Sequence, residues 1–124
     1  MTFDVEIVLR ERDYAVTERV VISPAPGDVE RAPSEWTDED VARVLEEILL
    51  SIDRVKHPAA ENRYVALRGF SWIVEPFAEG GVVIAIEIPS GAAVAGPFAA
   101  NARVLDQAIS RVLAAAAPAR PLVH

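Results

Sequence analysis

The chain has 124 residues, of which 52% are hydrophobic and 25% are charged, so it has the size and composition of one globular domain rather than of a disordered segment. It contains no cysteine, which excludes disulfides, thiolate metal sites and cysteine nucleophiles. Its formal net charge is −7, and because an acidic surface repels phosphate backbones, we expect no nucleic-acid partner.

The first two elements form a predicted β-hairpin. Residues 2–10 alternate between apolar and polar side chains, which is the pattern of a strand that buries one face. Residues 14–23 are rich in β-branched and aromatic side chains and follow a short polar link, which predicts the second strand. The register that places Asp4 opposite Arg19 joins opposite charges on the solvent face, and this pair supports the hairpin.

A long loop and a helix follow the hairpin. Residues 23–35 are rich in proline and charged side chains, which predicts a surface loop or an ordered flap. Thr37 and Asp40 then have the spacing of a helix capping box. Apolar residues recur at helical spacing over 41–55, and Pro58 ends the run. The sequence therefore predicts an amphipathic helix that lies on a core.

The second half of the chain predicts two more strands and a second helix. Residues 63–76 and 82–88 have the composition of strands and are joined by a turn that contains proline and glycine. The glycine-rich segment 89–97 predicts a connecting loop. Pro97 suits the first position of a helix, and Pro118 ends that helix.

This order of elements, ββαββα, predicts an α+β fold. We expect a two-layer sandwich in which a four-stranded antiparallel sheet carries both helices on one face. The strand orders 1-2-4-3 and 2-1-3-4 both keep every neighbour antiparallel. Residues 42–46 and 102–106 are nearly alike, so either a duplicated ββα unit or a chance coincidence of helix formers explains them. We expect one domain over residues 1–118 and a frayed tail over 119–124.

The sequence also bears on the compartment. The first ten residues carry acidic side chains where a signal peptide needs a basic region. The longest weakly charged stretch, 82–102, is interrupted by Glu87 and by prolines and glycines, so it does not supply the ~20 apolar residues of a membrane span. We therefore expect a cytoplasmic protein that does not enter a membrane.

Two charged residues fall on faces that the strand pattern assigns to the core, Glu18 and Arg68. A charge in that position needs a partner or a route to water. One interpretation is that each lies near a strand end or a sheet edge and reaches solvent. The alternative is a pocket between sheet and helices in which Arg68 binds an anionic ligand and Glu18 acts as an acid or base.

The loop before the second expected helix is a second candidate site. Gly91 and Gly96 lie in it, and backbone amides at a helix amino terminus can bind an anion. The loop lacks the lysine and the hydroxyl residue of a phosphate-binding loop, so a plain connection is the alternative. His57 and His124 do not have the spacing of metal ligands. The sequence therefore predicts neither a metal nor a cofactor.

The outer face of the second predicted hairpin is unusually apolar. It carries Leu67, Ile73, Val83 and Ala85. A patch of this kind marks a protein contact, and a two-fold axis through it buries the same residues on both subunits. The alternative is that loop 23–35 or the carboxy-terminal tail covers this face within one chain.

Two hypotheses about function follow from these candidates. The first is a small non-catalytic binding or interaction module that acts as a homodimer and also contacts an unidentified protein partner. The alternative is a small-molecule enzyme that uses Glu18 and Arg68 in a pocket between sheet and helices.

Overall fold

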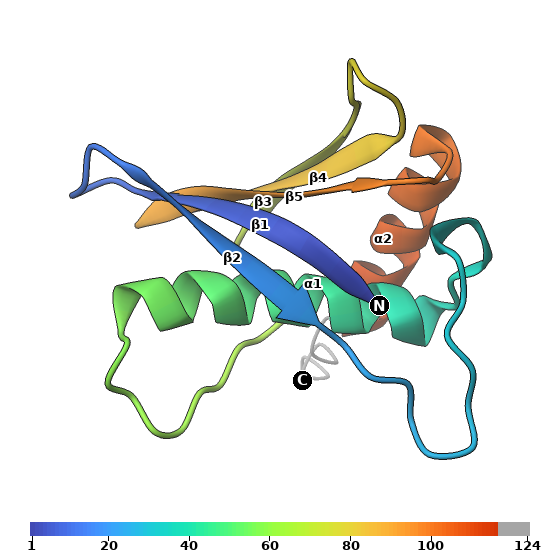
Figure 1. Ribbon diagram of the computed structural model, residues 1–124, viewed down its shortest axis with the longest axis horizontal. Coiled ribbons are helices and arrows are strands. Elements are labelled where there is room, and N and C mark those ends of the chain that lie inside the picture. The colour runs from blue at the N-terminus through green and yellow to red at the C-terminus, as the bar shows by residue number, and fades with distance from the viewer. Residues whose placement is uncertain (117–124) are drawn as a thin grey trace, which may run out of the picture.

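The computed structural model describes residues 1–116 of the chain. Its elements are β1 (Thr2–Leu9), β2 (Ala15–Val21), the short 3-10 helix η1 (Pro33–Glu35), α1 (Asp38–Lys56), β3 (Ser71–Pro76), β4 (Val82–Ile88), β5 (Gly91–Phe98) and α2 (Ala102–Ala116). The strands form one antiparallel sheet, and α1 runs beneath β1 and β2 in Figure 1. The α+β class is confirmed, but the sheet has five strands instead of the expected four.

The first hairpin has the register that the sequence predicts. Asp4 lies opposite Arg19, and Arg19 Nε is 3.2 Å from Asp4 Oδ1. The alternate side chains of β1 are buried, and these are Phe3, Val5, Ile7 and Leu9. A slip of one residue would turn this whole apolar set toward water, and for this reason the alternation fixes the register.

The predicted loop over residues 89–97 is wrong, because most of it belongs to strand β5. Ala93 and Ala95 are buried at the centre of the sheet. At Gly91, a Cβ atom would lie 2.4 Å from the backbone oxygen of Val8, so only glycine fits beside β1 at this position. The segment forms a strand here although glycine, alanine and proline are poor strand formers.

Strand β5 decides the topology. The sheet order is β2-β1-β5-β4-β3, so β5 lies between β1 and β4. Both expected strand orders placed the two hairpins side by side and are wrong. The element order is ββαβββα, and it does not confirm a duplicated ββα unit.

Helix α2 begins later than the sequence predicts. Pro97 lies in β5, and the helix begins at Ala102. Asn101 precedes it, and its Oδ1 accepts a hydrogen bond of 3.1 Å from the amide of Val104. An asparagine in this position satisfies an amide that the helix itself leaves unpaired, so the helix start needs no proline. The expected tail over 119–124 lies outside the described residues.

Strand β3 is shorter than the predicted strand over 63–76. It begins at Ser71, after Gly69, whose φ of +78° is incompatible with a continuous strand. Leu67 therefore does not lie on the outer face of a strand, as we expected, but packs against the hydrophobic core.

Helix α1 agrees with its sequence pattern. The side chain of Thr37 accepts a bond of 3.2 Å from the amide of Asp40, and the amide of Thr37 donates one of 3.0 Å to the Asp40 carboxylate. This reciprocal pair is the predicted capping box. The apolar side chains of the helix are buried at Val41, Val44, Leu45, Ile48, Leu49 and Ile52. The helix packs on β1, β2 and β5, whereas α2 packs on α1 and β3.

Among residues 1–116, no helix combines the length and the apolar character that a bilayer crossing requires.

Candidate functional site

One face of the sheet carries an apolar patch that reaches solvent. We call this side the outer face; its side chains alternate along each strand with those of the core. Ile73, Ala85 and Val94 lie next to each other across β3, β4 and β5. Val8 lies opposite Ala92 on the neighbouring strands. We define the outer patch as Val8, Ile73, Val83, Ala85, Ala92 and Val94.

The large members of the outer patch are well exposed. The exposed fraction is 51% for Ile73, 42% for Val94 and 43% for Val8. The alanines at 85 and 92 leave a shallow hollow of about 340 Å³ between them. Exposed apolar side chains that adjoin one another are typical of a protein contact, whereas single exposed ones are not.

Polar side chains surround the outer patch. Glu6 lies beside Val94 on β1, and Glu87 lies between Ala92 and Ser71. All three of these polar side chains are exposed. An apolar centre inside a polar rim is the usual anatomy of a protein interface.

Three of the four predicted interface residues lie on this outer face: Ile73, Val83 and Ala85. The sequence analysis missed Val8, Ala92 and Val94. The sequence did contain a signal for Ala92 and Val94: they alternate with Ala93 and Ala95, which is the period-two pattern of a strand, although most of its residues are small.

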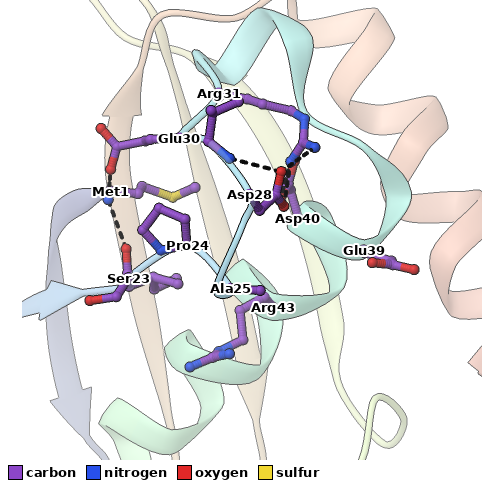
Figure 2. Close-up of a pocket in the computed structure, with 12 residues that line it drawn as sticks. Met1, Ser23, Pro24, Ala25, Asp28, Glu30, Arg31, Glu39, Asp40 and Arg43 are labelled. Atoms are coloured by element: carbon purple, nitrogen blue, oxygen red, sulfur yellow. Dashed lines mark hydrogen bonds and ion pairs between the residues drawn. The ribbon is translucent and has the colours of Figure 1, made fainter.

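Loop 23–35 does not cover this face in the structure. The loop lies below the sheet in Figure 1 and lines a pocket of about 160 Å³ together with Met1, Asp40 and Arg43 (Figure 2). The amino group of Met1 pairs with the carboxylate of Glu30 and donates a bond of 2.8 Å to the carbonyl of Ile22. The alternative that this loop covers the apolar face within one chain is therefore wrong, and the carboxy-terminal tail, the other segment named in that alternative, lies outside the described residues.

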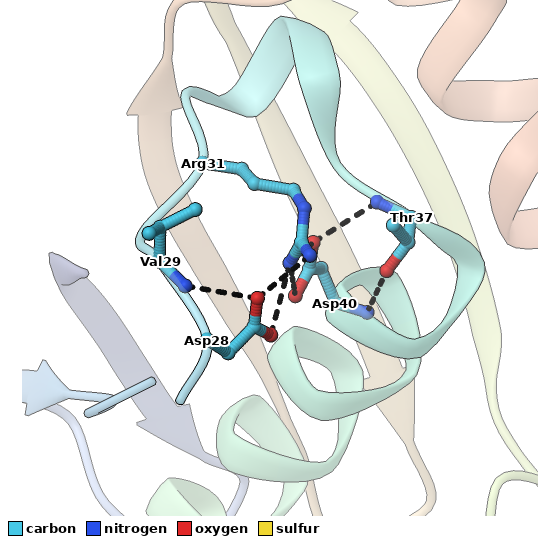
Figure 3. Close-up of polar contacts among 5 residues, drawn as sticks. All are labelled: Asp28, Val29, Arg31, Thr37 and Asp40. Carbon is cyan, nitrogen blue, oxygen red and sulfur yellow. Dashed lines mark hydrogen bonds and ion pairs between the residues drawn. The ribbon is translucent and has the colours of Figure 1, made fainter. Parts of the chain in front are cut away.

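An ion network fastens the loop to the start of α1 (Figure 3). Arg31 Nη2 lies 2.8 Å from Asp28 Oδ1, and Arg31 Nη1 lies 3.2 Å from Asp40 Oδ2. The amide of Val29 donates a bond of 2.9 Å to Asp28. This amide, followed by Arg31, lowers the pKa of Asp28 below its ordinary value. The loop is thus an ordered flap in which the charges of Asp28, Arg31 and Asp40 are paired.

Glu18 and Arg68 are not brought together. Glu18 lies on β2 at one edge of the sheet, and its Oε1 is 3.0 Å from Arg54 Nε on α1. Arg68 is exposed and precedes β3, which is the opposite edge of the sheet. The structure thus gives Glu18 a different basic partner from the one that the sequence suggested.

Arg54 also connects Glu18 to Ser51 and, through it, to the backbone of α1. Its Nη2 donates a bond of 3.0 Å to Ser51 Oγ, and this hydroxyl donates one of 2.8 Å to the carbonyl of Glu47. Ser51 is fully buried. The sequence did not single out Arg54, because nothing in the local pattern of a helix indicates a partner 36 positions away.

Gly91 and Gly96 lie in strand β5 rather than in a loop. Gly91 lies opposite Leu9 on one side and Ile88 on the other. A Cβ at Gly96 would lie 3.0 Å from the carbonyl oxygen of Val82. At both positions glycine thus avoids a clash between a Cβ atom and a backbone carbonyl oxygen of the neighbouring strand.

No family model, curated protein or solved structure shows significant similarity to this chain. Within the described residues, no group of three or more histidine, cysteine or acidic side chains has the arrangement of a metal site.

Proposed function

We propose that this protein is a non-catalytic interaction module that acts as a homodimer. In this proposal both helices form one layer against the inner face of the sheet, and the outer face meets another protein molecule. The observation that carries the proposal is the outer patch, with Ile73 half exposed at its edge. Burial of such a patch stabilises an association by about 25 cal/mol per Å² of apolar surface removed from water, before the costs of binding are subtracted.

The alternative hypothesis is an enzyme that uses Glu18 and Arg68. Glu18 is paired with Arg54, and Arg68 lies at the other end of the strand order. A general acid or base must lie within hydrogen-bond reach of the group whose proton it moves, in the same site as the residue that binds the ligand. The separation of the two residues favours the interaction module over the enzyme.

The test is the substitution Ile73→Asp, measured by light scattering coupled to gel filtration. The wild type is expected to have the mass of a dimer, and the variant that of a monomer, because a buried carboxylate without a partner is costly. Val104→Asp is the matched control, since Val104 is exposed on α2 and outside the outer patch. A wild type that stays monomeric at high micromolar concentration would contradict the proposal.

A thermal-shift screen separates the two hypotheses independently. An anionic metabolite that raises the melting temperature of the wild type, but not of Arg68→Ala, would favour the enzyme.

A further inference from the structure

Strand β3 is an edge strand with unpaired backbone groups. The amide of Phe77 bonds the carbonyl of Gly81 at the end of the β3–β4 hairpin. In an antiparallel pair the bonded positions alternate, so Ser71, Ile73 and Glu75 bond β4, whereas the backbone groups of Trp72 and Val74 point away from it. Pro76 is also an outward position, where its missing N–H removes no bond of the sheet.

Nothing in the described part of the chain pairs with these outward groups. No hydrogen bond from residues 1–116 reaches the amides of Trp72 or Val74 outside the sheet. The other edge strand, β2, carries two charged side chains at its centre, Glu18 and Arg19. Charge on an edge strand opposes pairing with another chain. In β3 the charged residue and the proline, Glu75 and Pro76, lie at the end of the strand, and residues 71–74 before them are uncharged.

We propose that two copies of this chain pair antiparallel along the β3 edge, about a two-fold axis at Ile73. This inference rests on the proposed homodimer and names how its subunits meet. Trp72 exchanges both backbone bonds with the partner's Val74, and Val74 does the same with the partner's Trp72. Two five-stranded sheets then form one continuous sheet, and the four outward amides of the pair are satisfied.

The side chains of β3 select this register. Ile73 lies directly opposite its own copy at a non-hydrogen-bonded position, where side chains approach most closely. Glu75 lies opposite the partner's Ser71, so the two carboxylates are kept apart. A register centred on Val74 would need an N–H from Pro76, and one centred on Glu75 would place like charges opposite each other.

A register centred on Trp72 is also disfavoured. It would require Phe70 to bond as a strand residue, but β3 begins at Ser71 and the preceding Gly69 has a positive φ of +78°. The register centred on Ile73 uses both outward amides and stays within the strand. It also buries Ile73, the edge of the outer patch, against its own copy, and the rest of the two patches then forms one apolar surface on which a further protein can dock.

Cysteine pairs test the register directly, because the natural chain contains no cysteine. Ser71 and Glu75 are both exposed, so Ser71→Cys and Glu75→Cys are expected to fold normally. In the proposed pairing, two copies of Ser71 lie about 14 Å apart, as do two copies of Glu75, whereas Ser71 lies opposite the partner's Glu75. A mild oxidant is therefore expected to crosslink the two variants when they are mixed, and neither variant alone.

Val94→Cys is the control for a dimer that packs face to face. Val94 lies at the centre of the sheet, two strands away from the β3 edge, so two copies lie about 24 Å apart in the edge-paired dimer. A dimeric wild type that crosslinks through Val94→Cys, and not in the mixed pair, would overturn the edge pairing and leave the homodimer intact. A monomeric wild type would overturn both proposals.

Hydrogen exchange gives a second readout without any substitution. Exchange at the amides of Trp72 and Val74 is expected to slow as protein concentration rises, because these amides become bonded only in the dimer. The outward amides of the other edge, at Thr17 and Arg19, are the internal control and should keep their rates. Equal concentration dependence at both edges, or none at β3, would overturn the proposal.

Discussion

The carboxylate of Glu18 on β2 accepts a hydrogen bond of 3.0 Å from the guanidinium of Arg54 on α1. The two residues are 36 positions apart in the chain, and the side chain of each is partly buried. This ion pair joins an edge strand to the helix beneath it, and it supplies the partner that a charge on this face of the strand needs.

A double-mutant cycle on this pair is the first prediction. Glu18→Ala and Arg54→Ala are expected to show a coupling free energy of about 0.5–3 kcal/mol in urea unfolding, as contacting charged residues do. Glu18→Ala and Arg68→Ala should be additive within about 0.5 kcal/mol, because these residues lie apart. Coupling of Glu18 to Arg68 instead of Arg54 would restore the pocket hypothesis.

The second prediction concerns the core beneath the sheet. Ile48 on α1 is fully buried, so Ile48→Ala is expected to lower the free energy of unfolding by about 2–5 kcal/mol. Val104→Ala removes an exposed apolar side chain from α2 and should cost less than about 0.5 kcal/mol. A loss below about 1 kcal/mol at Ile48 would mean that α1 does not lie on the core.

The third prediction tests the central position of β5. A Cβ at Gly91 would approach the carbonyl oxygen of Val8 to 2.4 Å. The backbone of β1 cannot easily shift to relieve this contact, because it is hydrogen-bonded to strands on both sides. Gly91→Ala is therefore expected to destabilise the fold by about 1–3 kcal/mol, the usual cost of overpacking. Ala92→Ser, at the adjacent half-exposed position, is the control, with an expected change within about 0.5 kcal/mol. Equal stability of the two variants would argue against β5 beside β1.

The fourth prediction is a pH dependence of stability. The pKa of Asp28 is lowered by the amide of Val29 and by Arg31, and the pKa of Asp38 is lowered by Arg111. Because both carboxyls have a lower pKa in the folded chain, the unfolded chain binds more protons near their ordinary value of 3.8. The contribution of these two carboxylates to the free energy of unfolding is therefore present above pH 3.8, and it is lost as the pH falls through their lower pKa values in the folded chain.

Urea unfolding between pH 2 and pH 7 measures this effect. Asp28→Asn and Asp38→Asn are each expected to reduce the fall in stability below about pH 4, because the titrating group is gone. High salt should weaken the effect, since both ion pairs are at the surface. An acid dependence that is the same in wild type and both variants would contradict the assigned ion pairs.

Local patterns in the sequence determined several elements of this protein. The alternation in residues 2–10 fixed both the strand and its register, because a shift by one residue would expose the whole apolar set. Thr37 and Asp40 marked the start of α1, because a capping box forms within one helical turn and needs no distant residue.

Only the tertiary structure decided the centre of the sheet and the partner of Glu18. The segment Gly91–Phe98 is built from small residues and a proline, so its own strand propensity is low. It becomes a strand because β1 and β4 hydrogen-bond it on both sides, and its glycines fit there because these neighbours leave no room for side chains. In the same way, Arg54 reaches Glu18 only after α1 has packed on β2, and such pairings between distant segments leave no local pattern in the chain.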